Sequence, residues 1–340
     1  MALSRMHKGI AALVVALIAV VALGYGGLRY LESGVVASIR TWAKETPPDM
    51  RVELGDVTYS LLNNRLVLSN VRADYLFMGR KTVTTVGRVE IDNPDAAFLE
   101  AMANPETPLK QPVVNVADKI AFTSASTGPD PEWRVAQGTY TKIRIDLAKL
   151  REVLASGFDA QKIPQLIALT SYASAESDGL SVTIKENSPV GVPFQLTVRS
   201  INVRDYTQGK LAQAVIADMA YTVNGSAVVK LAEMTMEGVT PPSDALMEEL
   251  NALAPDASTE KTLDLLSRIV LAPEPLLKKF ELKGVTSVVP QYPVSLARLT
   301  FTNPSTAPYA CSLELEHLVL PAETDALQVI RMIDLKQIDL

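Results

Sequence analysis

The fold is decided by the stretch Val57-Thr58-Tyr59-Ser60-Leu61-Leu62-Asn63-Asn64-Arg65-Leu66-Val67-Leu68. Apolar side chains alternate with mostly polar ones on both sides of the Asn63-Asn64 pair, at Val57, Tyr59, Leu61, Leu66 and Leu68. A period of two is typical of a β-strand with one buried face. Asparagine tolerates the positive φ angles of a tight turn. The stretch therefore predicts an antiparallel β-hairpin.

Strand patterns of the same kind recur to the end of the chain. They cover residues 114–122, 139–147, 180–184, 194–203, 217–223, 294–301 and 313–320. Antiparallel strands add sideways at about 4.8 Å each, and a broad sheet curls. We therefore expect a mainly β (α+β) protein, in which an elongated, curved antiparallel sheet forms a groove. Helical patterns near residues 241–254 and 258–271 predict two of the short helices that cover it.

The N-terminus contains an uncharged run of membrane-spanning length. Residues 9–28 are rich in Ala, Val, Leu and Ile, and a helix of this length covers about 30 Å, the thickness of a bilayer's hydrocarbon core. We expect an uncleaved signal-anchor; the alternative is a signal peptide cleaved at Ala22-Leu23-Gly24. Basic residues in segment 1–8 place this end in the cytoplasm.

The remaining chain is then exported. We expect a membrane-proximal helix over residues 29–46, a first β-rich unit over 47–160 and a second over 161–340. Both readings of the N-terminus carry these units across the membrane. The expected location is a bacterial inner membrane crossed once, with most of the chain in the periplasm.

Composition excludes several functions. The formal charge is −6, from 32 Lys+Arg against 38 Asp+Glu, and without a basic cluster the chain lacks the attraction that nucleic acids require. One cysteine and two histidines predict no metal centre. No nucleophile elbow, Walker loop or dinucleotide-binding pattern is present, so neither a cofactor nor an enzymatic activity is expected.

Some residues invite a catalytic interpretation. His317 shares strand parity with Cys311, Leu313, Leu315 and Val319, which would place it on the apolar side. A Cys311–His317 dyad is disfavoured because six residues of extended strand span roughly 20 Å. Both residues are therefore expected to be structural.

Acidic residues recur at predicted strand ends, where a carboxylate pair could act as an acid and a base. They are Asp92, Asp146, Asp205 and Glu237. Helix capping and turn formation explain such positions more often. Likewise, Asn224-Gly225-Ser226 fits a glycosylation sequon, but between two apolar runs it favours a hairpin turn.

An apolar concave sheet face suits acyl chains, because each buried CH₂ contributes roughly 0.8 kcal/mol. The residues expected to line it are Val57, Tyr59, Leu66, Leu68, Ile143, Ile145, Leu196, Met219, Tyr221, Met234 and Met236. Methionine adapts to irregular ligand shapes. Ordinary core packing explains the same alternation, so that alternative stays open.

Residues 55–62, 65–71 and 86–94, together with the single N-terminal anchor, resemble the start of AsmA-like envelope proteins. The likeness covers residues 1 to about 100. It implies an elongated, taco-shaped β-groove with a role in lipid handling or outer-membrane assembly. The predicted function is lipid binding or transfer in the bacterial envelope, with inner-membrane lipids, a phospholipid ligand and envelope proteins as partners. The alternative is a nonenzymatic scaffold or assembly module.

Overall fold

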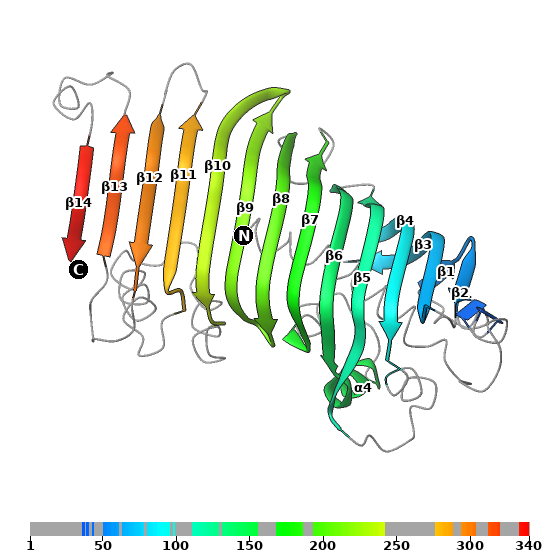
Figure 1. Ribbon diagram of the computed structural model, residues 1–340. Coiled ribbons are helices and arrows are strands. Elements are labelled where there is room, and N and C mark those ends of the chain that lie inside the picture. The colour runs from blue at the N-terminus through cyan, green and yellow to red at the C-terminus, as the bar shows by residue number, and fades with distance from the viewer. Residues whose placement is uncertain are drawn as a thin grey trace. The chain divides into compact units, whose positions relative to one another are not determined.

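The computed structural model describes residues 36, 37, 39, 40, 43, 50–60, 63–77, 80–95, 98, 111–128, 131–155, 168–185, 193–241, 276–287, 294–303, 312–319 and 333–339. Most of them are in β-strands (Figure 1). The elements are β1 Met50–Glu53, β2 Val57–Ser60, β3 Arg65–Phe77, β4 Arg80–Pro94, β5 Val113–Gly128, β6 Glu132–Asp146, α4 Leu147–Ala155, β7 Thr170–Ile184, β8 Phe194–Thr207, β9 Lys210–Val223, β10 Ser226–Val239, β11 Lys279–Ser287, β12 Ser295–Thr302, β13 Ser312–Val319 and β14 Ile333–Asp339.

The strands form one large antiparallel sheet, as the sequence predicts. Its order is β1-β3-β4 and then each strand in turn to β14, while β2 also pairs with β3. The chain divides into two compact units. Unit 1 holds residues 1–195 and 205–208, and unit 2 holds residues 196–204 and 209–340.

Both predicted hairpin turns are confirmed. Val57 pairs with Leu68 and Tyr59 with Leu66, around Asn64 at φ 42°. The hydroxyl of Tyr59 donates a hydrogen bond to the Asn64 side chain at 2.7 Å. Between β9 and β10, Asn224 and Gly225 have φ angles of 50° and 78°. This is the two-residue turn with positive φ at both positions that matches strand twist.

In unit 1 the two faces of the sheet differ sharply. Leu66, Ile91, Ile120, Tyr140 and Ala175 are cross-strand partners in turn from β3 to β7, and each is at most 7% exposed. The neighbouring row on the opposite face is polar: Arg65, Asp92, Lys119, Thr141 and Ser174. Each fully buried Leu, Ile or Phe contributes about 1.5–3 kcal/mol, so the apolar face is the core of unit 1.

The long strands of unit 1 change side-chain parity at one shared position. Leu68 and Val71 are both buried although they are three residues apart, because Asn70 between them has φ 52°. On β5 and β7 the same shift occurs at Ser124 (φ 55°) and Gly179 (φ 65°). The register places these residues on one line that crosses the sheet, which we call the positive-φ row. A residue in this conformation bends its strand locally.

Strands between those of the positive-φ row carry small residues at the same line. Gly87 of β4 lies beside Ser124, and a Cβ at Gly87 would be 3.1 Å from the Ser124 Cβ. A Cβ at Gly179 would be 2.8 Å from that of Ala136 on β6. The close approach explains why Gly and Ala alternate with the positive-φ residues.

Unit 2 repeats the arrangement. Asp218 of β9, Gly284 of β11 and His317 of β13 have φ angles of 49°, 62° and 52°. Ala232 of β10 and Ala297 of β12 lie between them in the register. On the strands of unit 2, too, the apolar-face residues on either side of this line are therefore three positions apart instead of two.

Two helical segments adjoin the sheet of unit 1. Asp146 caps α4, because the Lys149 amide donates to its carboxylate at 3.1 Å, and Leu147 and Leu150 are buried. Leu147 is thus the first residue of a helix, whereas the sequence pattern predicts that it is the last residue of a strand. Segment 29–46, for which a helix is predicted, is helical where described, and Ile39 is buried.

Other sequence expectations fall outside the described residues: the segment 9–28, the helix predicted near 241–254, of which only residue 241 is described, and the helix predicted near 258–271. In the described part of the chain, no helix has the length and apolar character needed to cross a membrane.

Candidate functional site

The candidate site is the apolar face of the sheet. Ten of the eleven residues predicted to line a groove are buried themselves, are register partners of a buried apolar residue or lie two positions from one within a strand. Tyr221 lies two positions beyond Met219, whose register partner Leu231 is buried. Sequence alternation does not show whether a residue on this face is covered by other parts of the protein or remains partly exposed.

In unit 1 this face is filled. Val57, Leu66, Leu68, Ile143 and Ile145 are between 0% and 6% exposed, and Tyr59 is 9% exposed. These predicted lining residues are therefore packed against other parts of the protein. Their burial matches the core-packing alternative for this part of the face.

In unit 2 the apolar face is less completely covered. One row runs from Ile216 on β9 through Met234, Leu282, Leu299 and Leu315 on β13. The first two are 5% and 7% exposed, whereas the three leucines are only half-buried. In this row the apolar face is therefore more exposed on β11 to β13 than on β9 and β10.

A second row on the same face lies beside it. It joins Ala214, Met236, Phe280, Phe301 and Leu313, in which only Ala214 is fully buried. The predicted lining residues Leu196, Met219, Tyr221 and Met236 are likewise half-buried. Large half-buried apolar side chains on neighbouring strands form the part of the molecule best able to hold an apolar ligand.

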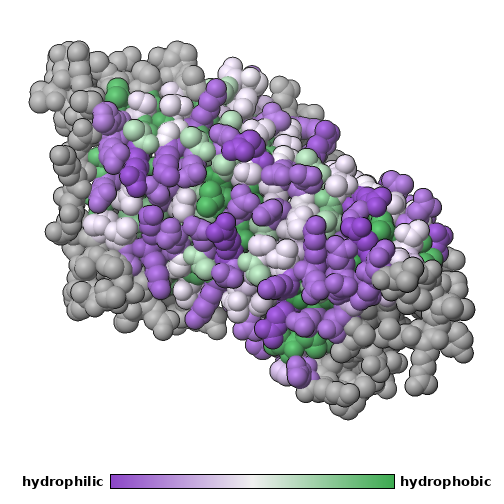
Figure 2. Space-filling view, viewed as in Figure 1, coloured by the Kyte–Doolittle hydropathy of each residue, from purple (hydrophilic) through white to green (hydrophobic). Residues whose placement is uncertain are grey.

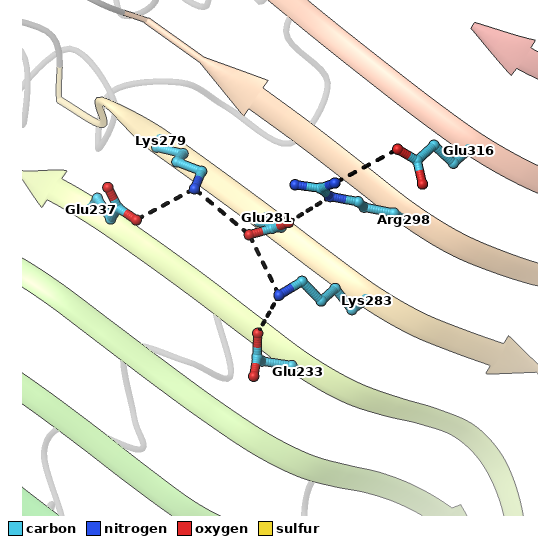
Figure 3. Close-up of polar contacts among 7 residues, drawn as sticks. All are labelled: Glu233, Glu237, Lys279, Glu281, Lys283, Arg298 and Glu316. Atoms are coloured by element: carbon cyan, nitrogen blue, oxygen red, sulfur yellow. Dashed lines mark hydrogen bonds and ion pairs between the residues drawn. The ribbon is translucent and has the colours of Figure 1, made fainter. Parts of the chain in front are cut away.

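The opposite face of unit 2 carries a charged cluster. Over β11 to β13 the face turned to the viewer is mainly hydrophilic (Figure 2). At its centre Glu281 accepts a hydrogen bond from Arg298 Nε at 2.6 Å and lies 3.7 and 3.8 Å from the ammonium groups of Lys279 and Lys283 (Figure 3). The Glu281 side chain is only 7% exposed. A buried carboxylate persists when cations and hydrogen bonds compensate its lost hydration.

An outer shell of acids completes this cluster. Glu233 pairs with Lys283 at 2.7 Å, Glu237 with Lys279 at 3.5 Å, and Glu316 with Arg298 at 3.7 Å (Figure 3). The hydrogen bond from Lys283 to Glu233 raises the pKa of that ammonium. The cluster's cations are thus engaged by the protein's own acids, and we assign it to stability of the polar face.

His317 does not point as its strand parity predicts. Its positive φ shifts the alternation, so Leu318 rather than Val319 pairs with the apolar residue Leu296. His317 is exposed, and Val319 is 43% exposed. Cys311 lies outside the described residues.

The four acidic residues at strand ends have separate structural surroundings. Asp92 pairs with Arg65 at 2.8 Å and Glu237 with Lys279. Asp146 caps α4, and Asp205 occupies a positive-φ position. Among the residues that the structure describes, no group of three or more His, Cys, Asp or Glu could hold a metal ion.

A set of aromatic residues in unit 1 is not evident from the sequence. The ring of Tyr172 lies 5.4 Å from that of Tyr140, edge to face, and 4.8 Å from that of Tyr206, stacked. Phe122 stacks on Tyr140 at 6.4 Å and leans over Gly138, where a Cβ would lie 2.4 Å from the Phe122 ring. The three tyrosines come from β6, β7 and β8, so only the register brings them together.

Burial raises the pKa of Tyr140, and burial together with the two neighbouring tyrosines raises that of Tyr172. Both hydroxyls therefore stay protonated at physiological pH, and each has a proton available to donate. Comparison with known proteins adds no identity: no family model, curated protein or solved structure matches the chain.

Proposed function

We propose that this protein binds lipid in the bacterial envelope, as a single-pass inner-membrane protein whose body lies in the periplasm. The apolar face of unit 2 would receive the acyl chains, and binding would serve lipid transfer or retention. The resemblance of residues 55–94 to AsmA-like envelope proteins supports the same role.

The observation that carries this proposal is the contrast between equivalent rows. In unit 1, Leu66, Ile91 and Ile120 are at most 3% exposed, whereas Leu282, Leu299 and Leu315 in unit 2 are half-buried. Half-buried leucines on consecutive strands lose much of the free energy that burial provides. An acyl chain lying on them would supply the missing contacts.

The dimensions also suit this ligand. The row from Ile216 to Leu315 crosses five strands, β9 to β13, which at about 4.8 Å per strand spacing is roughly 19 Å. One leaflet of a bilayer contributes about half of the 30 Å hydrocarbon core, so an acyl chain reaches about 15 Å. A single chain would therefore fit along one row.

The test uses the full-length protein and Leu299→Gln, which places an amide on the row at similar volume. Each protein is incubated with phosphatidylethanolamine and phosphatidylglycerol vesicles and reisolated, and retained phospholipid is counted by native mass spectrometry. We expect the variant to retain at least about five times less lipid, because a polar group in the acyl site is left without a partner. Glu314→Gln, on the opposite face of β13, is the matched control and should retain as much as the wild type. Lipid retention by neither protein, or by both equally, would contradict the proposal.

A scaffold function is the second candidate, favoured by the filled face of unit 1. A rigid, internally packed sheet suits an interaction module. It predicts that the reisolated wild-type protein carries no phospholipid and retains envelope proteins.

A further inference from the structure

The tyrosines of unit 1 place polar groups on a face that is otherwise apolar. Tyr140 occupies the row of Leu66, Ile91 and Ile120 and is 7% exposed, whereas Tyr172 and Tyr206 are half-buried. This face is therefore less completely covered at Tyr172 and Tyr206, although Ala175 and Leu180 of β7 are buried. Ligand sites combine such an apolar lining with a few converging polar groups.

Two of the three hydroxyls make no hydrogen bond to the residues that the structure describes. Within the described part of the chain, neither Tyr140 Oη nor Tyr172 Oη takes part in a hydrogen bond. Among the described residues, the side-chain atoms that are sealed from solvent and make no hydrogen bond are Thr300 Oγ1 and Arg65 Nε, and the latter forms an ion pair with Asp92. The two tyrosine oxygens are not among these atoms, so both keep some accessible surface. A buried tyrosine normally bonds its hydroxyl to a partner, so two unused neighbouring donors need an external acceptor.

The electrostatic surroundings restrict the charge of that acceptor. Burial and the neighbouring Tyr140 and Tyr206 raise the pKa of Tyr172, and among the described residues no cation contributes to this shift. A carboxylate or phosphate held here would be a buried charge without a counterion, which is strongly unfavourable. A neutral carbonyl oxygen accepts both hydrogen bonds without this cost.

We propose that Tyr140 and Tyr172 bind the ester carbonyl group of an acyl ester, a lipid's glycerol ester in the function proposed above. The inference rests on that function but adds a second site in unit 1 and a chemical preference. The acyl chain lies on the apolar face, and the hydroxyls donate to the carbonyl oxygen. The site distinguishes esters from ethers, which lack this acceptor, and from fatty-acid anions, which carry an unpaired charge.

The experiment compares two lipids in one sample. Full-length protein is incubated with vesicles of equal amounts of diester and diether phosphatidylcholine with the same C18:1 chains, then reisolated, and the retained lipids are counted by mass. We expect the wild type to retain the diester over the diether by roughly fivefold, as one to two net hydrogen bonds provide. In Tyr140→Phe/Tyr172→Phe this ratio should fall to about one while total lipid stays similar.

Tyr75→Phe is the matched control, because its hydroxyl is bonded to Thr84 Oγ1 at 3.0 Å and lies outside the proposed site. This variant should keep the wild-type ratio. A second competition, between methyl oleate and oleate at pH 7, should favour the ester in the wild type only. Removing two unpartnered hydroxyls should leave the circular dichroism spectrum and melting temperature unchanged.

The outcomes separate the two proposals. Retained lipid without a diester preference, a preference that survives the double variant, or stronger retention of oleate would overturn the tyrosine site and leave the lipid function standing. Retention of no lipid at all would overturn both.

Discussion

Asn70 of β3 and Gly87 of β4 lie opposite each other between the register pairs Ser69–Arg88 and Val71–Val86, and only Asn70 has positive φ. Both strands nevertheless change parity here, because Leu68 and Val71 are buried on one and Val86 and Val89 on the other. One residue with positive φ beside one small residue is the unit from which the positive-φ row is built.

The row predicts that Gly179 is intolerant of a side chain. Its φ is 65°, and an added Cβ would lie 2.8 Å from the Ala136 Cβ. Gly179→Ala should therefore lower the free energy of unfolding by at least about 2 kcal/mol in urea titrations. Gly128→Ala is the control, since its Cβ would be 3.9 Å from the nearest side-chain atom. Equal unfolding midpoints for the two variants would contradict this account of the row.

Arg298 should be worth more to stability than a typical surface cation. It is the nearest cation to Glu281, whose side chain is 7% exposed. Arg298→Met leaves that buried carboxylate with two more distant lysines and should cost about 2–3 kcal/mol. Arg51→Met breaks the Arg51–Glu53 pair, whose side chains are 76% and 50% exposed, and should cost below about 1 kcal/mol. The same loss in both variants, measured by urea unfolding, would show that Glu281 does not depend on Arg298.

Two threonines on β12 should respond oppositely to valine. Thr300 Oγ1 is sealed from solvent without a hydrogen-bond partner, whereas Thr302 Oγ1 is bonded to Ser312 Oγ. Thr300→Val should be neutral or stabilise by up to about 1 kcal/mol, and Thr302→Val should destabilise by about 1 kcal/mol. The pair is measured by differential scanning calorimetry, and a larger loss at Thr300 would be the contrary result.

Asp74 should contribute stability that depends on pH. A hydrogen bond from Arg72 Nε at 2.8 Å lowers the pKa of its carboxyl in the folded state. The contribution is therefore complete above the unfolded-state pKa of about 3.9 and disappears as the pH falls through the lower folded value. The difference in urea midpoint between wild type and Asp74→Asn should stay constant from pH 5 to 8 and shrink below pH 4. A difference that grows on acidification would reverse the assigned sign.

The cap of α4 should be measurable as well. Asp146→Ala removes the acceptor for the Lys149 amide and should cost about 1 kcal/mol. Glu152→Ala, at an exposed position of the same helix, tests whether the loss comes from the cap rather than from charge. Thermal unfolding followed by circular dichroism should place Glu152→Ala close to the wild type; matching losses would argue against a capping role.

The strands were predictable but their lengths were not, and the positive-φ positions explain why. The predicted strand at 114–122 stops just before Ser124, the one at 180–184 begins just after Gly179, and the one at 194–203 stops just before Asp205. At each of these residues the period of two breaks, although the strand continues. Two apolar residues three positions apart, separated by Gly, Ala, Asn, Ser or Asp, are the signal for a continuing strand.

The candidate site was predictable to the same degree. Alternation alone places Leu66 and Met236 on the apolar face, since parity follows from sequence. Their difference in burial depends on what packs over each strand, which alternation does not encode. The tyrosine set has no local pattern either, because Tyr140, Tyr172 and Tyr206 lie on three consecutive strands, more than 30 residues apart in sequence, and meet only in the folded sheet.

The alternation of Asn70, Gly87, Ser124, Ala136 and Gly179 also limits how such a sheet can change its size during evolution. Losing or gaining one strand would place two positive-φ residues, or two small residues, next to each other on neighbouring strands. The alternation would then be broken at that point of the sheet. Gene segments encoding a whole hairpin avoid this mismatch. Relatives of this chain should therefore differ in length by even numbers of strands.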